Sequence, residues 1–393
     1  MRRKRNEMKK SCAHRRTTKF EQFSTEIFFE IFEYLKGNHI FKSFFDLNQR
    51  FNELVCNAPN VHLDCLRSKT KLYHRFLQVF HSQHIISMSL SYENVNLLQR
   101  LHHKNQLKAL SLSTVSLRAF EDQISEILSS YRHQLISLTI HFADMHYSDT
   151  GSRAAQSFGY LLTELSLLKH LVLEHPYGID SITYMPSMII NRSIINLTIT
   201  LHDDRRLIPL LYRFEQLKTL IIHHSSILRN MALYDNLLLY RSQLHEKTSI
   251  DYPVKIQHIK IYDNEMLFEK LERLFQIIIS PNLLTLSLFT SRRSFQVDLM
   301  GYKQVQSSNN KKQWYSLLKR YLLSTMKQFH IEYENVERTL FLGNLQQVKN
   351  DFIKHTEFSS TRKVSCSYEQ NEKRFSFDVF LSTQDILPIS ITK

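Results

Sequence analysis

Along most of the chain, hydrophobic residues recur in the six-residue pattern apolar-x-x-apolar-x-apolar. The pattern occurs nine times, and successive copies begin 22 residues apart at the shortest (85 to 107) and 43 at the longest (283 to 326). The last two apolar positions alternate with polar ones, which predicts a short strand with one buried face. Because a chain rich in Leu and Ile forms some copies by chance, we expect about six of the nine to be strands. The copies are Ile85/Met88/Leu90, Leu107/Leu110/Leu112, Leu135/Leu138/Ile140, Leu168/Leu171/Leu173, Ile194/Leu197/Ile199, Leu217/Leu220/Ile222, Ile256/Ile259/Ile261, Leu283/Leu286/Leu288 and Met326/Phe329/Ile331.

Between the expected strands lie apolar residues with helical spacing, as at Ile124, Ile127, Leu128 and Tyr131. A strand followed by a helix, repeated along the chain, stacks into a parallel sheet lined by helices. The pattern resembles leucine-rich repeats, although the Asn or Cys that their template places just past the strand is present only as Asn264. The resemblance implies an α/β fold in which residues 58–338 form an irregular leucine-rich-repeat-like β/α solenoid with a parallel sheet.

The stretch from Phe20 to Val55 has a different pattern, that of short amphipathic helices. Apolar residues at 27, 28, 31, 32 and 35 share one helical face, which predicts a helix over residues 25–36. Ser24 can cap its start, and Gly37 can follow as its stop. Asn38 and Asn48 can open two further helices, so three helices are expected in about 36 residues.

This stretch resembles the F-box, whose pattern begins Leu-Pro-x-Glu-Ile and ends Val-x-x-Arg-Trp-x-x-Leu. Here the start reads Phe23-Ser24-Thr25-Glu26-Ile27 and the end reads Leu47 to Leu54, with Phe-Ser in place of Leu-Pro and Phe51 in place of Trp. The resemblance implies that residues 20–57 are an F-box that binds the Skp adaptor of a cullin-RING ubiquitin ligase. The residues at the matching positions are Phe23, Ser24, Glu26, Ile27, Ile31, Leu35, Ile40, Leu47, Phe51 and Leu54.

The polar positions of the nine expected strands form a second candidate surface. They are small and hydroxylic in the first strands and become aromatic, charged and imidazole-rich from His170 onward. Solenoids offer extended surfaces to ligands, and large rigid side chains bury area at low entropic cost. We therefore hypothesise that the later strands dock a protein client, with an ordinary solvated face as the alternative. The candidate residues are His170, Glu174, His223, His258, Lys260, Tyr262, Phe289 and His330.

The net charge of +14 is concentrated at the N-terminus. Residues 1–19 hold nine basic residues against Glu7, which is +8 of the +14, so we expect a basic disordered tail that serves nuclear import or polyanion contact or has no role. The four cysteines show no metal-binding or disulfide spacing, and no apolar run is long enough to span a bilayer. We expect a soluble protein of the cytoplasm or nucleus, with no membrane contact.

The sequence offers no catalytic motif. Six glycines leave neither a Walker A loop nor a G-x-G-x-x-G, and neither an H-E-x-x-H nor a Cys/His finger spacing is present. We therefore expect no enzyme activity, no cofactor and no metal site. Residues 301–313 lack periodicity and indicate an insertion, and residues 339–393 are expected to cap the solenoid with a helix over 340–354 and a hairpin around Asn371.

These patterns together predict a substrate receptor, monomeric within a larger complex, that binds the Skp adaptor and cullin through the F-box and an unidentified protein client through the solenoid. Two alternatives remain from other classes of function. One is an interaction scaffold whose F-box does not engage the ligase. The other is a nuclear nucleic-acid binder that acts through the basic tail, which the weakly charged body makes the less favoured reading.

Overall fold

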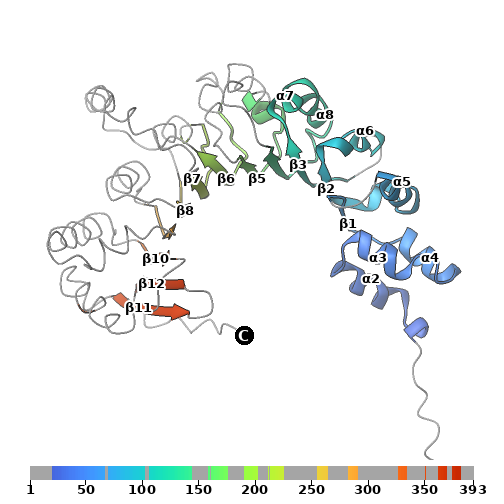
Figure 1. Cartoon of the computed structure of the whole chain (residues 1–393), viewed down its shortest axis with the longest axis horizontal. Coiled ribbons are helices and arrows are strands. Elements are labelled where there is room, and N and C mark those ends of the chain that lie inside the picture. The colour runs from blue at the N-terminus through green and yellow to red at the C-terminus, as the bar shows by residue number, and fades with distance from the viewer. Residues whose placement is uncertain are drawn as a thin grey trace, which may run out of the picture. The chain divides into compact units, whose positions relative to one another are not determined.

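The computed structural model shows a mixed α/β protein (Figure 1). It describes residues 20–66, 70–101, 106–143, 158–159, 161–175, 190–201, 211, 213–224, 255–263, 282–290, 326–333, 350, 362–369 and 374–381. The chain divides into two compact units. The first comprises Met1–Leu90 and Arg100–Leu107, and the second comprises Ser91–Gln99 and Lys108–Lys393.

The first unit begins with the helices that the sequence predicts. After the 3₁₀ turn η1 (Phe20–Gln22) come α2 (Thr25–Glu33), α3 (Gly37–Phe44) and α4 (Gln49–Cys56). Their shared core is aromatic, since the buried rings of Phe28 and Phe51 meet edge to face with centroids 5.2 Å apart. Ser24 is the N-cap residue of α2, as expected, but its side chain bonds no backbone N–H of the helix.

The role expected of Gly37 is wrong. The helix α2 ends at Glu33, and Gly37 is the first residue of α3, where it is buried. A Cβ at this position would lie 2.6 Å from Leu63 Cδ2 and 2.7 Å from Val61 Cγ1. Gly37 is therefore required because β1 packs directly on the helix backbone, and α3 begins two residues earlier than an N-cap at Asn38 predicts.

The sheet of the first unit contains a strand that the nine copies omit. The strand β1 (Val61–Asp64) pairs in parallel with β2 (Ile85–Ser91), and α5 (Thr70–Val79) and the 3₁₀ turn η2 (Ser82–His84) connect them. Residues 58, 61 and 63 follow the same apolar pattern, but the first is the small Ala58, which hides the copy in the sequence. All three are buried.

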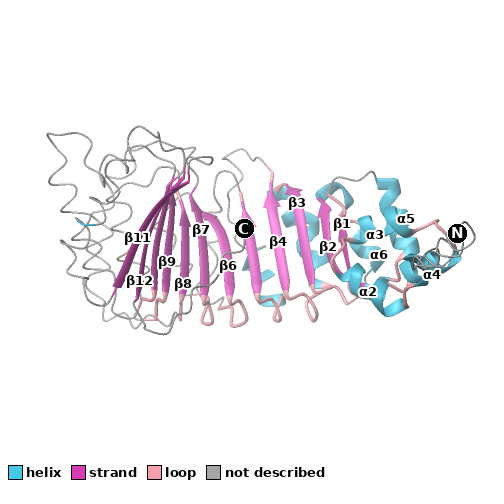
Figure 2. Ribbon diagram, turned by 90° about the horizontal axis from the view of Figure 1, so that it is seen from below, coloured by secondary structure: helices cyan, strands magenta, loops and turns pink. Residues whose placement is uncertain are grey.

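In the second unit, each strand pairs in parallel with the next from β3 to β10, so that the arrangement is solenoid-like (Figure 2). With β2, these strands coincide with all nine copies of the pattern, so the expectation of six was too low. The strands are β3 (Ala109–Val115), β4 (Ser137–Phe142), β5 (His170–Glu174), β6 (Asn196–Leu201), β7 (Thr219–His224), β8 (His258–Tyr262), β9 (Thr285–Thr290) and β10 (Gln328–Tyr333).

The strands stay in register because each begins with the same backbone arrangement. Two consecutive N–H groups donate to one carbonyl of the preceding repeat, as Ile136 and Ser137 do to Lys108, and Lys169 and His170 do to Ile136. The same pair of bonds recurs before β6, β7, β8, β9 and β10. The Leu and Ile residues on the inner side of β4 to β9 are no more than 1% exposed, so this face is the core.

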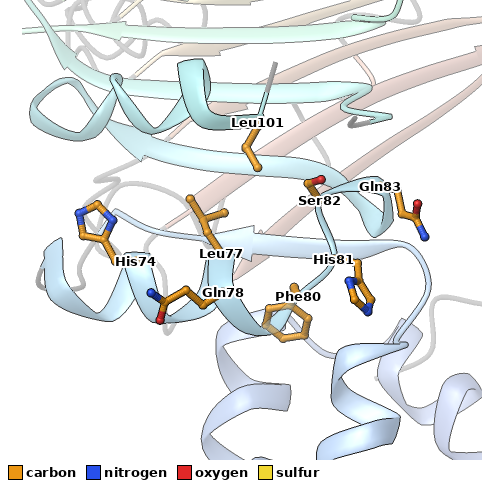
Figure 3. Close-up of a pocket in the computed structure, with 8 residues that line it drawn as sticks. All are labelled: His74, Leu77, Gln78, Phe80, His81, Ser82, Gln83 and Leu101. Carbon is orange, nitrogen blue, oxygen red and sulfur yellow. The ribbon is translucent and has the colours of Figure 1, made fainter. Parts of the chain in front are cut away.

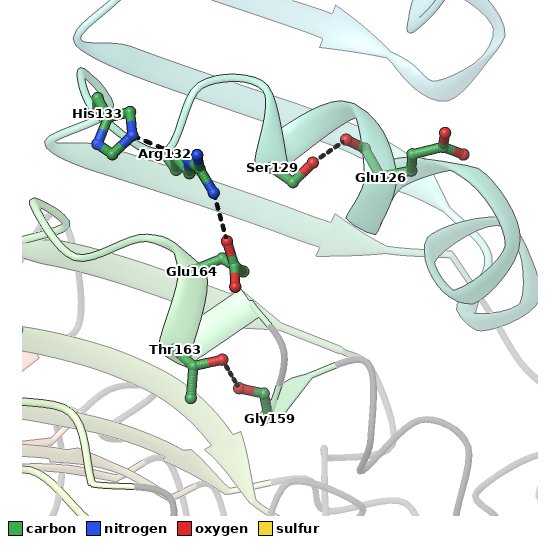
Figure 4. Close-up of polar contacts among 7 residues, drawn as sticks. All are labelled: Glu126, Ser129, Arg132, His133, Gly159, Thr163 and Glu164. Carbon is green, nitrogen blue, oxygen red and sulfur yellow. Dashed lines mark hydrogen bonds and ion pairs between the residues drawn. The ribbon is translucent and has the colours of Figure 1, made fainter.

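Short helices follow the strands where the structure describes the connections. The 3₁₀ turn η3 (Tyr92–Asn94) and α6 (Leu97–Leu101) precede β3, and α7 (Leu117–Ala119), the π-helical turn η4 (Phe120–Ile124) and α8 (Ser125–Ser129) precede β4. Ile127 and Leu128 are buried, as their helical spacing predicts. Figure 4 shows Arg132, after α8, facing Glu164 of the next repeat, with 3.4 Å between Nη1 and Oε2.

The predicted C-terminal hairpin is present. The strands β11 (Arg362–Glu369) and β12 (Arg374–Leu381) pair antiparallel, and β12 pairs antiparallel with β10, the last parallel strand. The hairpin therefore covers the edge that β10 would otherwise expose. The predicted tail over 1–19, the insertion over 301–313 and the helix over 340–354, except for Asn350, lie outside the described residues. Within the described part of the chain, no helix has the length and apolarity to cross a bilayer.

Candidate functional site

The residues at the F-box-like positions divide into surface and core. Ile27 is 41% exposed and Leu47 is 60% exposed, so both large aliphatic side chains are open to a partner. Ser24 and Glu26 are also exposed, and Phe23, Ile31 and Leu35 are half-buried. These residues can meet a partner without unfolding of the helices.

The remaining three F-box-like candidates belong to the core. Ile40 is 1% exposed, Phe51 is 2% and Leu54 is 5%. The Phe51 ring packs against Phe28, and all three side chains are too buried to touch a partner in this conformation. Their part is therefore to hold the surface residues in place.

Polar contacts fix the two ends of this surface. The Arg50 guanidinium on α4 donates to the backbone carbonyls of Glu21 and Phe23, which ties the segment before α2 to α4. Asn48 caps α4 by accepting a hydrogen bond from Phe51 N at 3.0 Å. Two residues before Asn48, Asp46 adopts a left-handed conformation with φ 66°, and its N–H donates to Asn52 Oδ1 at 2.7 Å. This turn places Leu47 on the surface.

A second candidate surface lies on the polar face of the second unit's sheet. His223, Tyr262 and Phe289 occupy matching register positions on β7, β8 and β9. The His223 and Tyr262 rings are 4.6 Å apart with 6° between their planes, and the Tyr262 and Phe289 rings are 4.4 Å apart with 8° between theirs. We call this continuous stack of three half-buried rings the aromatic ladder.

Ionisable groups form a cluster next to the aromatic ladder on β10 and β12. His330 Nδ1 is 2.7 Å from Asp378 Oδ1, and His330 Nε2 is 3.4 Å from Glu332 Oε2. Burial lowers the pKa of His330, but its hydrogen bond to Asp378 and the charges of both carboxylates outweigh burial and raise the pKa above its ordinary value. We call His330, Glu332 and Asp378 the acidic corner, because two carboxylates surround one imidazole.

The ladder itself has altered titration. Burial lowers the pKa of His223, which keeps its ring neutral and able to stack, despite an opposing effect of the Glu174 charge. Burial and the charge of Glu332 raise the pKa of Tyr262. The phenol therefore stays protonated, and the ladder carries no formal charge of its own near neutral pH.

The other predicted client residues lie on the same face but outside the ladder. His170 on β5 bonds Asn196 at 2.7 Å, and His258 on β8 bonds Thr285 at 2.8 Å. Glu174 pairs with His141, with 2.9 Å between Oε2 and Nδ1, and the hydrogen bond lowers the pKa of Glu174 and raises that of His141. Lys260 is exposed. The structure thus brings the rings of His223, Tyr262, Phe289 and His330 together. His170, Glu174, His258 and Lys260 lie on the same face outside this run of rings, and the charge of Glu174 still acts on His223.

Sequence reasoning missed two residues of the acidic corner, Glu332 and Asp378. Glu332 alternates with the core residues of β10, so the sequence predicts that it lies on the polar face. The sequence does not predict which side chains it meets there. Asp378 lies 48 residues after His330 and reaches it only because the hairpin returns to β10. The alternation of polar and apolar residues in 374–381 was the only signal, and it does not specify which strand β12 pairs with.

The first unit also contains a cleft of about 530 Å³, shown in Figure 3. His74 and Gln78 of α5, His81 at the start of η2, and Leu101 are among its lining residues. No group of three or more His, Cys, Asp or Glu side chains within the described residues has metal-binding geometry. Burial, with the nearby charge of Asp64, raises the pKa of the Cys65 thiol to about 12, so this thiol is a poor nucleophile.

Comparison with known proteins assigns no family. No protein-family model matches the chain, and no curated protein matches it. Among solved structures, it resembles a chain in the crystal structure of the Rad7 and Elc1 complex in yeast, with a TM-score of 0.36 and 17% sequence identity. The match covers 68% of this chain and 64% of that chain, so less than two thirds of the yeast chain is spanned. Similarity at this level supports no statement about function.

Proposed function

We propose that this protein is the substrate receptor of a Skp-cullin-F-box ubiquitin ligase. In this proposal, the N-terminal helices α2 to α4 bind the Skp adaptor, which links the chain to the cullin. The polar face of the second unit's sheet holds a protein client. The complex acts in the cytoplasm, the nucleus or both.

The observation that carries the proposal is the way the F-box-like positions divide in three dimensions. The positions that match the pattern's interior lie in an aromatic core, whereas Ile27 and Leu47 leave large apolar side chains exposed. Water-exposed aliphatic residues cost free energy of roughly 25 cal/mol per Å² relative to burial. A partner that covers Ile27 and Leu47 therefore gains this free energy on binding.

The mechanism requires no chemistry from this chain. Holding a client near a ubiquitin-charged enzyme raises the effective concentration of the client's lysines, which converts an encounter between two molecules into a reaction within one complex. The two units suit this division of labour, because the helices and the sheet face present separate surfaces.

The test is co-purification of the Skp adaptor and cullin with the full chain. The informative variant is Ile27→Asp with Leu47→Asp, which places charge on the exposed residues and leaves the core intact. Leu66→Asp is the matched control, because Leu66 is 40% exposed in the same unit but lies outside residues 20–57. Circular dichroism confirms that each variant is folded.

We expect the intact chain and Leu66→Asp to capture the adaptor, and the double variant to lose capture by at least about tenfold, since the few residues that dominate an interface each cost about 2 kcal/mol or more when altered. Equal capture by the double variant would contradict the assignment of this surface. Failure of the intact chain to capture the adaptor would contradict the ligase role and favour an interaction scaffold.

A further inference from the structure

The aromatic ladder presents ring edges, not ring faces, to solvent. The centroid separations of 4.4 Å and 4.6 Å are close to the spacing of about 4.8 Å between neighbouring strands, and the planes are within 8° of parallel. The stack therefore runs across the strands, and each ring covers its neighbour's face. Ring edges are the positive part of the aromatic quadrupole, so they favour the face of another aromatic ring or an aliphatic group over a cation.

One end of the ladder joins the acidic corner. Phe289 lies in register with Glu332 on β10, and its ring centroid is 5.5 Å from that of His330. Asp378 lies in register with His330 on the next strand, β12. The Asp378 side chain is 19% exposed, and its Oδ1 bonds His330. Two carboxylates therefore lie within 3.4 Å of one imidazole at this corner.

The charge beside the middle of the ladder is opposite. Lys260 is exposed on β8, two residues before Tyr262 on the same face of the sheet. A basic group over the ladder would be repelled by Lys260, and a basic group at the corner would be attracted by Glu332 and Asp378. The polar face therefore favours an apolar group over the aromatic ladder and a cation at the acidic corner.

We propose that the aromatic ladder and the acidic corner together bind an extended segment of a partner protein that carries an aromatic residue followed or preceded, two positions away, by arginine or lysine. The aromatic residue packs on the ring edges of Tyr262 and Phe289. The basic residue bonds the carboxylates of Asp378 and Glu332. This inference describes the chemistry of the client, and it therefore rests on the proposed function.

The spacing follows from strand geometry. Phe289 lies on β9, and the acidic corner lies on the next two strands, β10 and β12. The corner is therefore roughly 5 to 10 Å from Phe289 across the sheet. An extended peptide rises by about 3.3 Å per residue. Side chains of an extended peptide alternate between its two faces, so two positions, about 6.6 Å, separate the residue over the ladder from the residue at the corner on the same face. Adjacent residues point to opposite faces, and six positions are too far.

The experiment measures binding of fluorescein-labelled nine-residue peptides to the full chain by fluorescence anisotropy. The probe carries Trp and Arg two positions apart in a Gly/Ser background. Three comparison peptides replace Arg by Glu, replace Trp by Ser, or move Arg to six positions from Trp. Adaptor capture is measured on the same protein preparation, so the two proposals are tested separately.

The matched protein variants alter carboxylates. Asp378→Asn with Glu332→Gln removes the charge of the two carboxylates and keeps their size, and Glu126→Gln makes the same kind of change at an exposed position of α8, outside the polar face of the sheet. We expect the first variant to weaken probe binding about tenfold, the loss typical of a charge-assisted hydrogen bond. We expect Glu126→Gln to bind the probe as the unaltered chain does.

The inference is supported if the probe binds about tenfold more tightly than each comparison peptide and only the corner variant loses this preference. It is overturned if the unaltered chain binds the four peptides equally or not at all, even where adaptor capture succeeds. Tighter binding of the peptide with Glu overturns it in favour of an acidic client held by Lys260 and the histidines. If adaptor capture fails while the probe binds selectively, the ligase role falls and the binding site remains.

Discussion

His330 on β10 and Asp378 on β12 are joined by 2.7 Å between Nδ1 and Oδ1, although 48 residues separate them in the chain. The contact connects the last parallel strand to the hairpin that covers its edge. Glu332 approaches the other ring nitrogen at 3.4 Å. A single imidazole therefore links the end of the repeat stack to its cap, and its protonation contributes to how firmly the cap is held.

This arrangement predicts that stability falls as pH rises. The folded-state pKa of His330 lies above its unfolded value of about 6.5. The contribution of the pair is therefore complete below the unfolded pKa and is lost as pH rises through the folded pKa. We expect His330→Gln to cost roughly 1.5–3 kcal/mol at pH 5.5, the range for a hydrogen bond to a charged group, and less at pH 8.5. Urea unfolding at both pH values measures this.

Asp378→Asn serves as the second variant for the same interaction. It keeps the size of the side chain and removes the charge that raises the pKa of His330, so it should flatten the same pH dependence. If His330→Gln lowered the free energy of unfolding by the same amount at both pH values, His330 would act by packing alone.

Gly37→Ala is predicted to destabilise the first unit. The new Cβ would overlap Val61 Cγ1 and Leu63 Cδ2, and Val61 is β-branched and has few alternative rotamers. Overpacking of this kind costs about 1–3 kcal/mol, which exceeds the gain of at most about 1 kcal/mol from the better helix propensity of Ala. The net loss is measured as a lower urea midpoint.

The control for Gly37→Ala is Ser43→Ala on the exposed side of the same helix α3. Ser43→Ala changes helix propensity without a packing clash. Because Ala is more favourable than Ser in a helix by about 0.5 kcal/mol, the free energy of unfolding should rise by a few tenths of a kcal/mol at most. If Gly37→Ala were as stable as Ser43→Ala, β1 would not pack against the backbone of α3 as described.

Thr114→Asn is predicted to stabilise the second unit. Thr114 has φ 55°, a left-handed conformation that is rare for a β-branched residue, at a bulge where Ser113 and Thr114 lie opposite His141. Asn tolerates this conformation, so the substitution should gain about 0.5–1 kcal/mol. Thermal unfolding measures the gain.

The same substitution on β4 provides the comparison. Thr139 lies in a regular part of the strand, where Asn is unfavourable, so Thr139→Asn should lower stability by up to about 1 kcal/mol. Opposite signs for the two Thr→Asn changes support strain at Thr114, and equal losses at both positions would exclude it.

Tyr131→Phe is predicted to cost about 1–3 kcal/mol. The phenol donates to the Leu98 carbonyl at 2.5 Å, and the ring is 1% exposed. Phe leaves that carbonyl without this donor in a buried place, and an unsatisfied buried acceptor carries the full desolvation penalty. Tyr92→Phe is the matched control, because its phenol meets Gln123 Oε1 at 3.4 Å near the surface and should change stability by less than about 0.5 kcal/mol. Equal losses for both changes would contradict this.

Local chemistry explains why so much of the fold was predictable. In β4, Leu138 and Ile140 alternate with polar residues. This period of two is enough to predict a strand with one buried face. The helix α4 begins where Asn48 predicts, because an N-cap is a contact within four residues. The strand β1 was missed only because Ala58 is a weak hydrophobic signal.

The sequence by itself determined the repeating strands, the three N-terminal helices and the hairpin, since period and capping are properties of neighbouring residues. Only the tertiary structure decided that Gly37 is a packing position, that Ile27 and Leu47 are surface residues, and that His330 meets Asp378. These outcomes depend on which segments pack together over long sequence separations. His223, Tyr262 and Phe289 each follow the last apolar residue of their copy of the six-residue pattern, so the repeat predicts that they share one face. Only the tertiary structure decided that their rings stack, because ring orientation depends on the packing of neighbouring strands.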